Sequence, residues 1–314
     1  MLDSLHIQNY RLFKDLTIEK LARVNLIAGK NNCGKTALLE ALRILGSNAN
    51  NLVINDIVAS RGDFQLGLES SYSSLFGTNH ELAGKDFFEK ASINGISITL
   101  DADDYKVHFD SSYFKNYKSF ELKDDILVRN PIVGQVVYLP LIFENDNDAK
   151  FWDKISLTPK EEKVIEILKI IDSRIKTVRF DSGNIKVLLD GEDKPRLMKN
   201  LGEGVNRLFS IALALVNAQK KMLLIDEFEV GLHHSVQEQL WEIIFKYAQE
   251  WDIQVFVTTH SLDTVRSFST VLDKNPDVGQ YLRLQKSRMT GDVEAVVYSQ
   301  KSLDFAIEDT LEMR

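Results

Sequence analysis

The sequence of 314 residues contains one cysteine, five prolines and no uninterrupted run of about 18 apolar residues. Its single cysteine, Cys33, cannot form an internal disulfide, which fits a reducing compartment. The lack of a long apolar run argues against a membrane-spanning helix. The first residues, Met1–His6, do not show the basic and then apolar pattern of a signal peptide. We therefore expect a cytoplasmic protein that does not enter a membrane.

Positive charge is also scarce. The chain has 38 lysine and arginine residues against 46 aspartate and glutamate residues, which gives a net charge of −8. Nucleic acids are bound largely by clustered basic side chains that neutralise phosphates, so this balance disfavours DNA as a partner without excluding a local basic patch. Basic residues do gather at Lys169–Arg179 and Lys194–Lys199. Solvated helix and loop faces are the simpler interpretation of both groups.

The length and the 44% hydrophobic content are typical of one globular domain with a sizeable insertion. We predict a single domain over residues 1–314, with an irregular insertion over 47–135 that contains antiparallel strands at Ile96–Asp101 and Tyr105–Phe109. Residues 150–200 are predicted to form a helical and β-hairpin segment. Further along, strands alternate with helices, which predicts an α/β fold with a mostly parallel core sheet.

Hydrophobic periodicity predicts the elements of this core. The predicted strands are Leu5–Tyr10, Leu16–Glu19, Val24–Ala28, Val136–Leu139, Met222–Ile225 and Gln254–Thr258. The predicted hairpins are Ile175–Phe180 with Ile185–Leu189, and Tyr281–Gln285 with Glu294–Tyr298. Long helices are expected at Val205–Val216 and at about Ser235–Gln249. Another helix should begin after Thr158, because a capping hydroxyl is followed there by Pro159 and, three residues after the cap, by Glu161.

Residues Gly29–Thr36 match the pattern G-x-x-x-x-G-K-[ST] in full. Gly29 and Gly34 allow successive backbone N–H groups to curl around phosphates, Lys35 can reach the β and γ oxygens, and the Thr36 hydroxyl can bind Mg²⁺. The match lies between a predicted strand and a predicted helix, which favours a phosphate loop over an ordinary glycine turn. We expect ATP to be bound there, and the remaining residues of the candidate site are Asn31, Asn32, Cys33 and Ala37.

A second motif is the apolar strand Met222–Ile225, which ends on Asp226 and Glu227. Two consecutive carboxylates at the end of a buried strand are costly unless a positive group meets them, and Mg²⁺ with a polarised water would do so. We expect Asp226 to hold the metal and Glu227 to orient or deprotonate the attacking water. Taken alone, such a pair is more often a helix cap or a surface turn. The phosphate loop is what favours the catalytic interpretation.

Two weaker signals accompany these motifs. His260 follows a strand at the expected carboxyl edge of the sheet, where ligands of α/β folds bind, and it could hydrogen-bond a γ-phosphate. Gly202, Glu203 and Gly204 precede a long apolar-faced helix, so their backbone N–H groups could meet a phosphate. By itself, each is as well explained by a structural histidine or a simple helix entry.

In combination, these residues resemble an ABC-type ATPase of the branch that includes SMC, RecF and the OLD family. The segments that carry the resemblance are Ile7–Phe13 as first strand, Gly29–Thr36 as Walker A, Leu201–Gly204 as signature loop, Met222–Glu227 as Walker B, Glu229–His233 as D-loop and Thr258–Ser261 with the switch histidine. The chain is most similar to compact, stand-alone OLD-like AAA ATPases without a fused Toprim nuclease, and Ile307–Arg314 resembles their endings.

The resemblance implies a P-loop NTPase fold of ABC type and the hydrolysis of ATP with Mg²⁺. It implies a head-to-tail homodimer or higher homo-oligomer, in which Gly202, Glu203 and Gly204 of one subunit contact the γ-phosphate bound to Lys35 of the other. Arg11 is expected to approach the nucleotide, although a solvated turn residue is the simpler interpretation of that position.

The resemblance also implies a switch that controls a separately encoded effector, such as a nuclease or toxin, in prokaryotic anti-phage defence. A RecF-like DNA-binding repair ATPase is the alternative, and a nucleotide-binding scaffold with negligible turnover is a third. Val230 stands where such proteins often carry asparagine. The chain lacks sustained heptads that would indicate an SMC-like tether, and it lacks a second acidic cluster after residue 262 that would indicate a Toprim nuclease.

Overall fold

The computed structural model of the chain describes residues 1–61, 75, 89–94, 96–101, 106–111, 118–121, 132–133, 135–141, 145–181 and 184–308. The chain divides into two compact units. Unit 1 comprises residues 1–21, 29–134 and 284–296, and unit 2 comprises residues 22–28, 135–283 and 297–314. Among the described residues, no helix is both long enough and apolar enough to cross a membrane.

Unit 1 contains an antiparallel sheet with the strand order β2-β1-β4-β5-β6-β7. Its strands are β1 (Leu5–Tyr10), β2 (Phe13–Ile18), β4 (Glu89–Ile93), β5 (Ile96–Asp101), β6 (Lys106–Ser111) and β7 (Lys118–Glu121). Strands β1 and β2 pair in the register Leu5↔Ile18, and β1 buries alternate residues because one face meets the core. Unit 1 also holds α1 (Lys35–Gly46), α2 (Asn51–Ser60) and β8 (Ile132–Val133).

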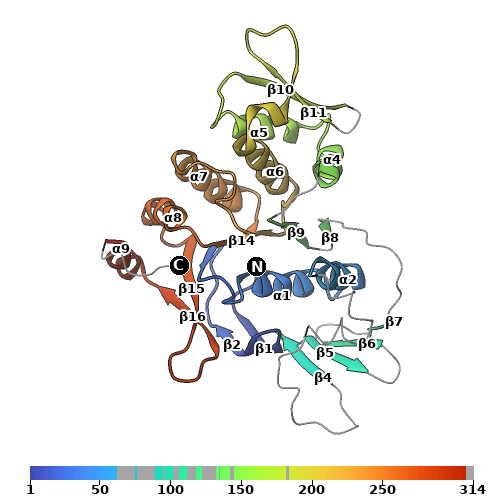
Figure 1. Cartoon of the computed structure of the whole chain (residues 1–314), viewed down its shortest axis with the longest axis vertical. Helices are drawn as coiled ribbons and strands as arrows, with labels where there is room; N and C mark the ends of the chain where they lie inside the picture. The colour runs from blue at the N-terminus through green and yellow to red at the C-terminus, as the bar shows by residue number, and fades with distance from the viewer. Residues whose placement is uncertain are drawn as a thin grey trace. The chain divides into compact units, whose positions relative to one another are not determined.

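Unit 2 contains a parallel sheet in which β3 (Val24–Ala28) and β13 (Met222–Ile225) flank β14 (Gln254–Thr259). The outer neighbours are β9 (Val136–Leu139), next to β13, and β15 (Gly279–Lys286), next to β3. Every residue of β3 and β14 is buried, as expected for strands covered on both faces. Helices α7 (His234–Glu250) and α8 (Leu262–Lys274) lie side by side in this unit (Figure 1).

The rest of unit 2 is built on the segment between β9 and β13. It contains α4 (Asn145–Asp153), α5 (Pro159–Leu168), β10 (Ile175–Asp181), β11 (Asn184–Leu189), β12 (Arg196–Leu197), a 3-10 turn at Met198–Leu201 and α6 (Glu203–Asn217). The rings of Trp152, Phe180 and Phe209 pack together with centroids 5.7 to 6.1 Å apart, and they join α4, β10 and α6. Towards the end of the chain follow β16 (Val293–Tyr298) and α9 (Gln300–Glu308).

The structure confirms the predicted α/β class with a mostly parallel core sheet and separate antiparallel strands. The helix start at Thr158 is also confirmed, since its hydroxyl accepts a hydrogen bond from the Lys160 backbone N–H. Glu161 reaches back to the backbone N–H of Leu157. The bounds of the insertion over 47–135 and of the segment over 150–200 stay predictions. Tyr105 and the turn that follows Asp101, like residues 309–314, lie outside the described residues.

Several predicted boundaries were wrong, most of them by one or two residues. The second strand spans Phe13–Ile18 and not Leu16–Glu19, because Phe13, Leu16 and Ile18 are its buried residues. Helix α6 begins at Glu203, two residues before the predicted Val205, so that Gly202 is its N-cap. Strand β14 extends one residue further, to Thr259.

Candidate functional site

The phosphate loop leaves β3 at Gly29 and enters α1 at Lys35. A Cβ atom on Gly29 would lie 2.4 Å from Cys33 Sγ and 2.6 Å from the carbonyl oxygen of Leu284. Gly34 caps α1 with a φ of 97°, and a Cβ there would lie 2.8 Å from the ring of Phe13. Both glycines are therefore required by the space around the loop, and Gly34 also by its left-handed backbone.

Inside the loop, Lys35 is buried and its Nζ donates hydrogen bonds to the carbonyl oxygens of Gly29 at 2.8 Å and Lys30 at 3.2 Å. The Lys35 side chain therefore points back towards the start of the loop. The other predicted residues of the loop differ in exposure. Asn31 and Asn32 are exposed, Cys33 and Ala37 are buried, and Thr36 is half-buried in the first turn of α1.

Arg11 is buried in unit 1. Its side chain is only 7% exposed, and its Nε donates a hydrogen bond of 3.1 Å to Glu40 on α1. Arg61 donates to the other oxygen of the same carboxylate at 2.7 Å. The interpretation of Arg11 as a solvated turn residue is therefore wrong, because burial requires an ionic partner and Glu40 supplies it. Its contact with a nucleotide stays a prediction.

In unit 2, Asp226 and Glu227 are fixed to the ends of the two neighbouring strands. The backbone N–H of Asp226 donates to the carbonyl of Leu139 at 2.9 Å. Thr258, at the end of β14, donates its hydroxyl to Asp226 Oδ1 at 2.5 Å and accepts from the Glu227 backbone N–H at 2.9 Å. Asp226 is 5% exposed. One hydroxyl thus orients both members of the predicted acidic pair.

A residue that sequence reasoning missed, Arg207, fixes the same turn from α6. Its guanidinium donates to the backbone carbonyls of Asp226 at 2.7 Å, Glu227 at 3.1 Å and Pro140 at 3.1 Å. Burial lowers the pKa of this guanidinium. A cation on the apolar face of a predicted helix was the available signal, because a buried charge needs partners.

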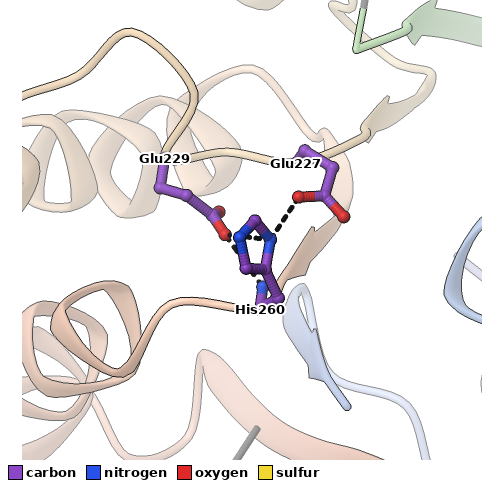
Figure 2. Close-up of side chains that lie close together, drawn as sticks. All are labelled: Glu227, Glu229 and His260. Atoms are coloured by element: carbon purple, nitrogen blue, oxygen red, sulfur yellow. Dashed lines mark hydrogen bonds and ion pairs between the residues drawn. The ribbon is translucent and has the colours of Figure 1, made fainter. Parts of the chain in front are cut away.

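Glu227, Glu229 and His260 come together beside Asp226 (Figure 2). Phe228 lies between the two glutamates and is fully buried, with its ring stacked on Trp241 at 4.3 Å between centroids. This anchor turns Phe228 inwards, while Glu227 and Glu229 both reach His260. Nδ1 of His260 hydrogen-bonds Glu227 and lies 2.9 Å from Glu229 Oε1. Sequence reasoning named Glu227 and His260 as separate catalytic candidates and gave Glu229 no chemical role.

The three side chains offer one imidazole and two carboxylate ligands whose atoms all lie within 4.8 Å of one another. Two carboxylates with a histidine suit a transition-metal ion, whereas Mg²⁺ prefers oxygen ligands alone. A carboxylate such as that of Glu227 can act as a general base, and the imidazole beside it is 48% exposed.

The predicted signature loop forms the start of α6. Gly202 and Glu203 are exposed, and a Cβ atom on Gly204 would lie 2.9 Å from the carbonyl oxygen of Gly231 in the predicted D-loop. Gly204 therefore allows two backbone segments of the same unit to touch. This close approach is a reason for a glycine there that the sequence did not indicate.

The register of the parallel sheet shows where the strands that precede the two main motifs end. Ala28, the last residue of β3, pairs with Thr259, while Ile225, the last residue of β13, pairs with Val257. Both strands therefore end at one edge of the sheet, one strand apart. The chain continues from Ala28 directly into Gly29 and from Ile225 directly into Asp226. Ligands of parallel α/β sheets bind outside this carboxyl edge.

Two family models match the chain. The first, described as "AAA domain, putative AbiEii toxin, Type IV TA system", matches residues 75–266, which is more than half of the chain. The second, described as "AAA ATPase domain", matches residues 1–127. The two matches together span the phosphate loop, the acidic pair and His260.

Two proteins of similar sequence are found. An "ATP/GTP phosphatase" of Helicobacter pylori is 22% identical over 330 residues, with 87% of this chain and 88% of that protein covered. An "uncharacterized protein" of Methanocaldococcus jannaschii is 33% identical over 87 residues, with 26% of this chain and 39% of that protein covered.

Solved structures of SMC head domains are similar in fold. The head domain from Thermotoga maritima has a TM-score of 0.51 at 13% identity, with 95% of this chain and 99% of that chain covered. A head bound to the C-winged helix domain of ScpA has a TM-score of 0.59 at 12% identity, with 95% and 97% covered. The head from Pyrococcus furiosus has a TM-score of 0.54 at 10% identity, with 98% of both chains covered.

These matches agree with the order of motifs along the chain and with the parallel sheet of unit 2. The fold is that of the SMC and ABC-type ATPase heads, and the chain is an ATPase. It belongs to the family of AAA domains described as putative AbiEii toxin, Type IV TA system.

Proposed function

We propose that this chain hydrolyses ATP with Mg²⁺ and uses the nucleotide to switch a separate effector protein. One observation carries the proposal: β3 and β13 end at the same edge of one parallel sheet. A glycine-rich phosphate loop follows the first strand, and an acidic pair follows the second. The combination is suited to phosphoanhydride cleavage, in which positioned donors and a metal neutralise the developing charge.

Each residue has a distinct role in the proposed reaction. The backbone of the loop and Lys35 bind the phosphates, while the Thr36 hydroxyl and the Asp226 carboxylate supply oxygen ligands of the kind that Mg²⁺ prefers. Glu227 accepts the proton of the attacking water. His260 holds the Glu227 carboxylate through Nδ1, and its ring is exposed enough to face a phosphate.

The proposed assembly is a head-to-tail homodimer or a higher homo-oligomer. Gly202 and Glu203 are exposed at the start of α6, so their backbone N–H groups are available to a γ-phosphate held by Lys35 of another subunit. The similar SMC head that is bound to a ScpA domain supports the idea that this fold can carry a partner protein.

We further propose that the chain lies close to the OLD-like branch and acts in prokaryotic anti-phage defence, beside an effector such as a nuclease or a toxin. The family description, which names a putative toxin of a toxin–antitoxin system, supports a role in such a module. The similar ATP/GTP phosphatase of Helicobacter pylori supports turnover of the nucleotide.

A Glu227→Gln variant tests the proposal. We expect it to bind ATP and Mg²⁺ with nearly unchanged affinity, because the substitution removes a charge but little volume. Its turnover should fall about 100-fold to 10,000-fold, the usual contribution of a general base. ATP should then accumulate bound, and the variant should elute as an oligomer in size-exclusion chromatography with ATP and Mg²⁺.

The matched control is Glu242→Gln, which changes an exposed glutamate on α7 that pairs with Lys274 at 2.9 Å. This control should keep wild-type turnover. Wild-type turnover in Glu227→Gln as well would show that the proposed base is wrong. An ATP-loaded Glu227→Gln variant that stays monomeric would contradict the proposed assembly.

A further inference from the structure

We infer that Glu229 is a positioning residue for the ATPase reaction, and that it acts by holding His260 where its ring meets Glu227. The inference rests on the proposed function, because it takes Glu227 as the base. It begins from the place of Glu229 in the turn after β13, where its side chain is 11% exposed and both carboxylate oxygens are engaged.

The carboxylate ties the turn after β13 to the end of β14. Oε2 accepts a hydrogen bond of 2.8 Å from the Thr259 hydroxyl, and Oε1 accepts one of 2.8 Å from the backbone N–H of His260. These two bonds fix the main chain that carries the imidazole. Bonds in which the acceptor is an ionised carboxylate are shorter and stronger than neutral ones.

The same carboxylate also constrains the ring of His260. Nδ1 faces Glu227 and Glu229 at once, and ionised carboxylates are only acceptors. A proton on Nδ1 allows the ring to donate to these acceptors. Glu229 thus sets the position of the main chain and favours the tautomer in which His260 donates to Glu227.

The inference predicts an effect on the chemical step and not on nucleotide binding. Glu229→Ala should lower kcat about 10-fold to 100-fold, since a displacement of about 1 Å in a catalytic group can cost that much. The KM for ATP and the affinity for a non-hydrolysable ATP analogue should change less than about twofold. Glu229→Gln keeps one acceptor oxygen and changes the volume of the side chain little. Its kcat should therefore lie between those of the wild type and Glu229→Ala.

A matched pair at Thr259 tests the hydroxyl that donates to Glu229 and that also accepts a hydrogen bond of 3.0 Å from the Ser261 backbone N–H. Thr259→Ser keeps the hydroxyl that donates to Glu229, whereas Thr259→Val keeps the shape of the side chain and removes the hydroxyl. Only the valine variant should lower kcat. This pair decides the matter if Glu229→Ala does not fold, as judged by its thermal unfolding midpoint.

A double-mutant cycle gives the sharpest test. If Glu229 acts through His260, the substitution Glu229→Ala should cost nothing further in a His260→Ala background. Additive losses in kcat, or a loss confined to KM, would overturn the inference. Full activity of Glu229→Ala beside an inactive Glu227→Gln would overturn this inference alone, whereas an active Glu227→Gln would overturn the proposed function itself.

Discussion

The phosphate loop and the acidic edge of the sheet are built in different ways. The loop is one continuous stretch, Gly29–Thr36, whose shape depends on glycines and on backbone groups. The acidic edge is assembled from three separate segments: the start of α6 with Arg207, the turn after β13, and the end of β14 from Thr258 to His260. A loop of the first kind can be recognised locally, whereas an edge of the second kind depends on which strands become neighbours.

The largest effect should come from breaking the loop. Gly34→Ala forces a side chain into a φ of 97° and places its Cβ 2.8 Å from the buried ring of Phe13. We expect ATP affinity, measured by isothermal titration calorimetry, to fall more than about 100-fold because the loop can no longer curl around the phosphates.

Gly191→Ala is the matched control for this substitution. Gly191 also has a positive φ, of 83°, but nothing lies within 4 Å of an added Cβ. The control reproduces the backbone strain of about 1 kcal/mol without the collision, and ATP affinity should be unchanged. An ATP affinity of Gly34→Ala within about threefold of the wild type would contradict the view that packing dictates the shape of the loop.

An intermediate effect should come from the acidic edge. Arg207→Ala removes the donors that reach the carbonyls of Pro140, Asp226 and Glu227. Leaving buried acceptors unsatisfied costs about 1 to 3 kcal/mol, so the free energy of unfolding in urea should fall by that amount. Because the turn that carries Glu227 loses its support, kcat should fall about 10-fold while ATP affinity changes little.

Arg207→Lys sharpens the result, since lysine keeps the charge but cannot bridge three acceptors in the planar manner of a guanidinium. The kcat and the free energy of unfolding of Arg207→Lys should both lie between those of the wild type and those of Arg207→Ala. Wild-type stability of Arg207→Ala would show that the edge does not depend on this cation.

The smallest effect on ATP binding and turnover should come from a buried acid near Arg207, whose titration changes stability and not the reaction. Burial raises the pKa of Asp148, on α4, to about 7. The hydrogen bond of 3.2 Å that Ser210 donates to this carboxylate lowers the pKa, but by less than burial raises it. Between about pH 4 and pH 7 the folded state therefore binds more protons at this site than the unfolded state. The stability that Asp148 contributes is then lost as pH rises through that interval, by at most on the order of 4 kcal/mol.

Asp148→Asn removes this titration. The difference between variant and wild type in the free energy of unfolding, measured in urea at pH 5 and pH 8, should shift in favour of the variant at pH 8. The comparison between the two proteins cancels the other titrating groups, which they share. Parallel pH profiles would show that Asp148 does not carry a raised pKa.

The comparison of the two regions also explains what the sequence could predict. Strands β3 and β13 were predicted to the residue, because each depends on a local pattern of apolar side chains. Asp226 and His260 were recognised because each directly follows a strand, and Glu227 because it forms an acidic pair with Asp226. Their roles in catalysis stay predictions, while their proximity at the sheet edge is observed for Glu227 and His260.

The residues that were missed or misread have partners far along the chain. Glu229 contacts residues 30 and 31 positions later, and Arg11 contacts Glu40, 29 positions later. No local pattern identifies these partners, because they depend on the pairing of strands and on the packing of a helix. Arg207 gave a weak signal as a cation on an apolar helix face, but its three carbonyl acceptors could not be named from sequence.

The contact between Gly204 and the carbonyl of Gly231 leaves no side chain between the two backbones. A methyl group at position 204 would lie in the space that this carbonyl group already occupies, so Gly204→Ala would have to push the first turn of α6 and the turn that follows Glu229 apart. A side chain at this one position would therefore disturb the predicted signature loop and the predicted D-loop at the same time.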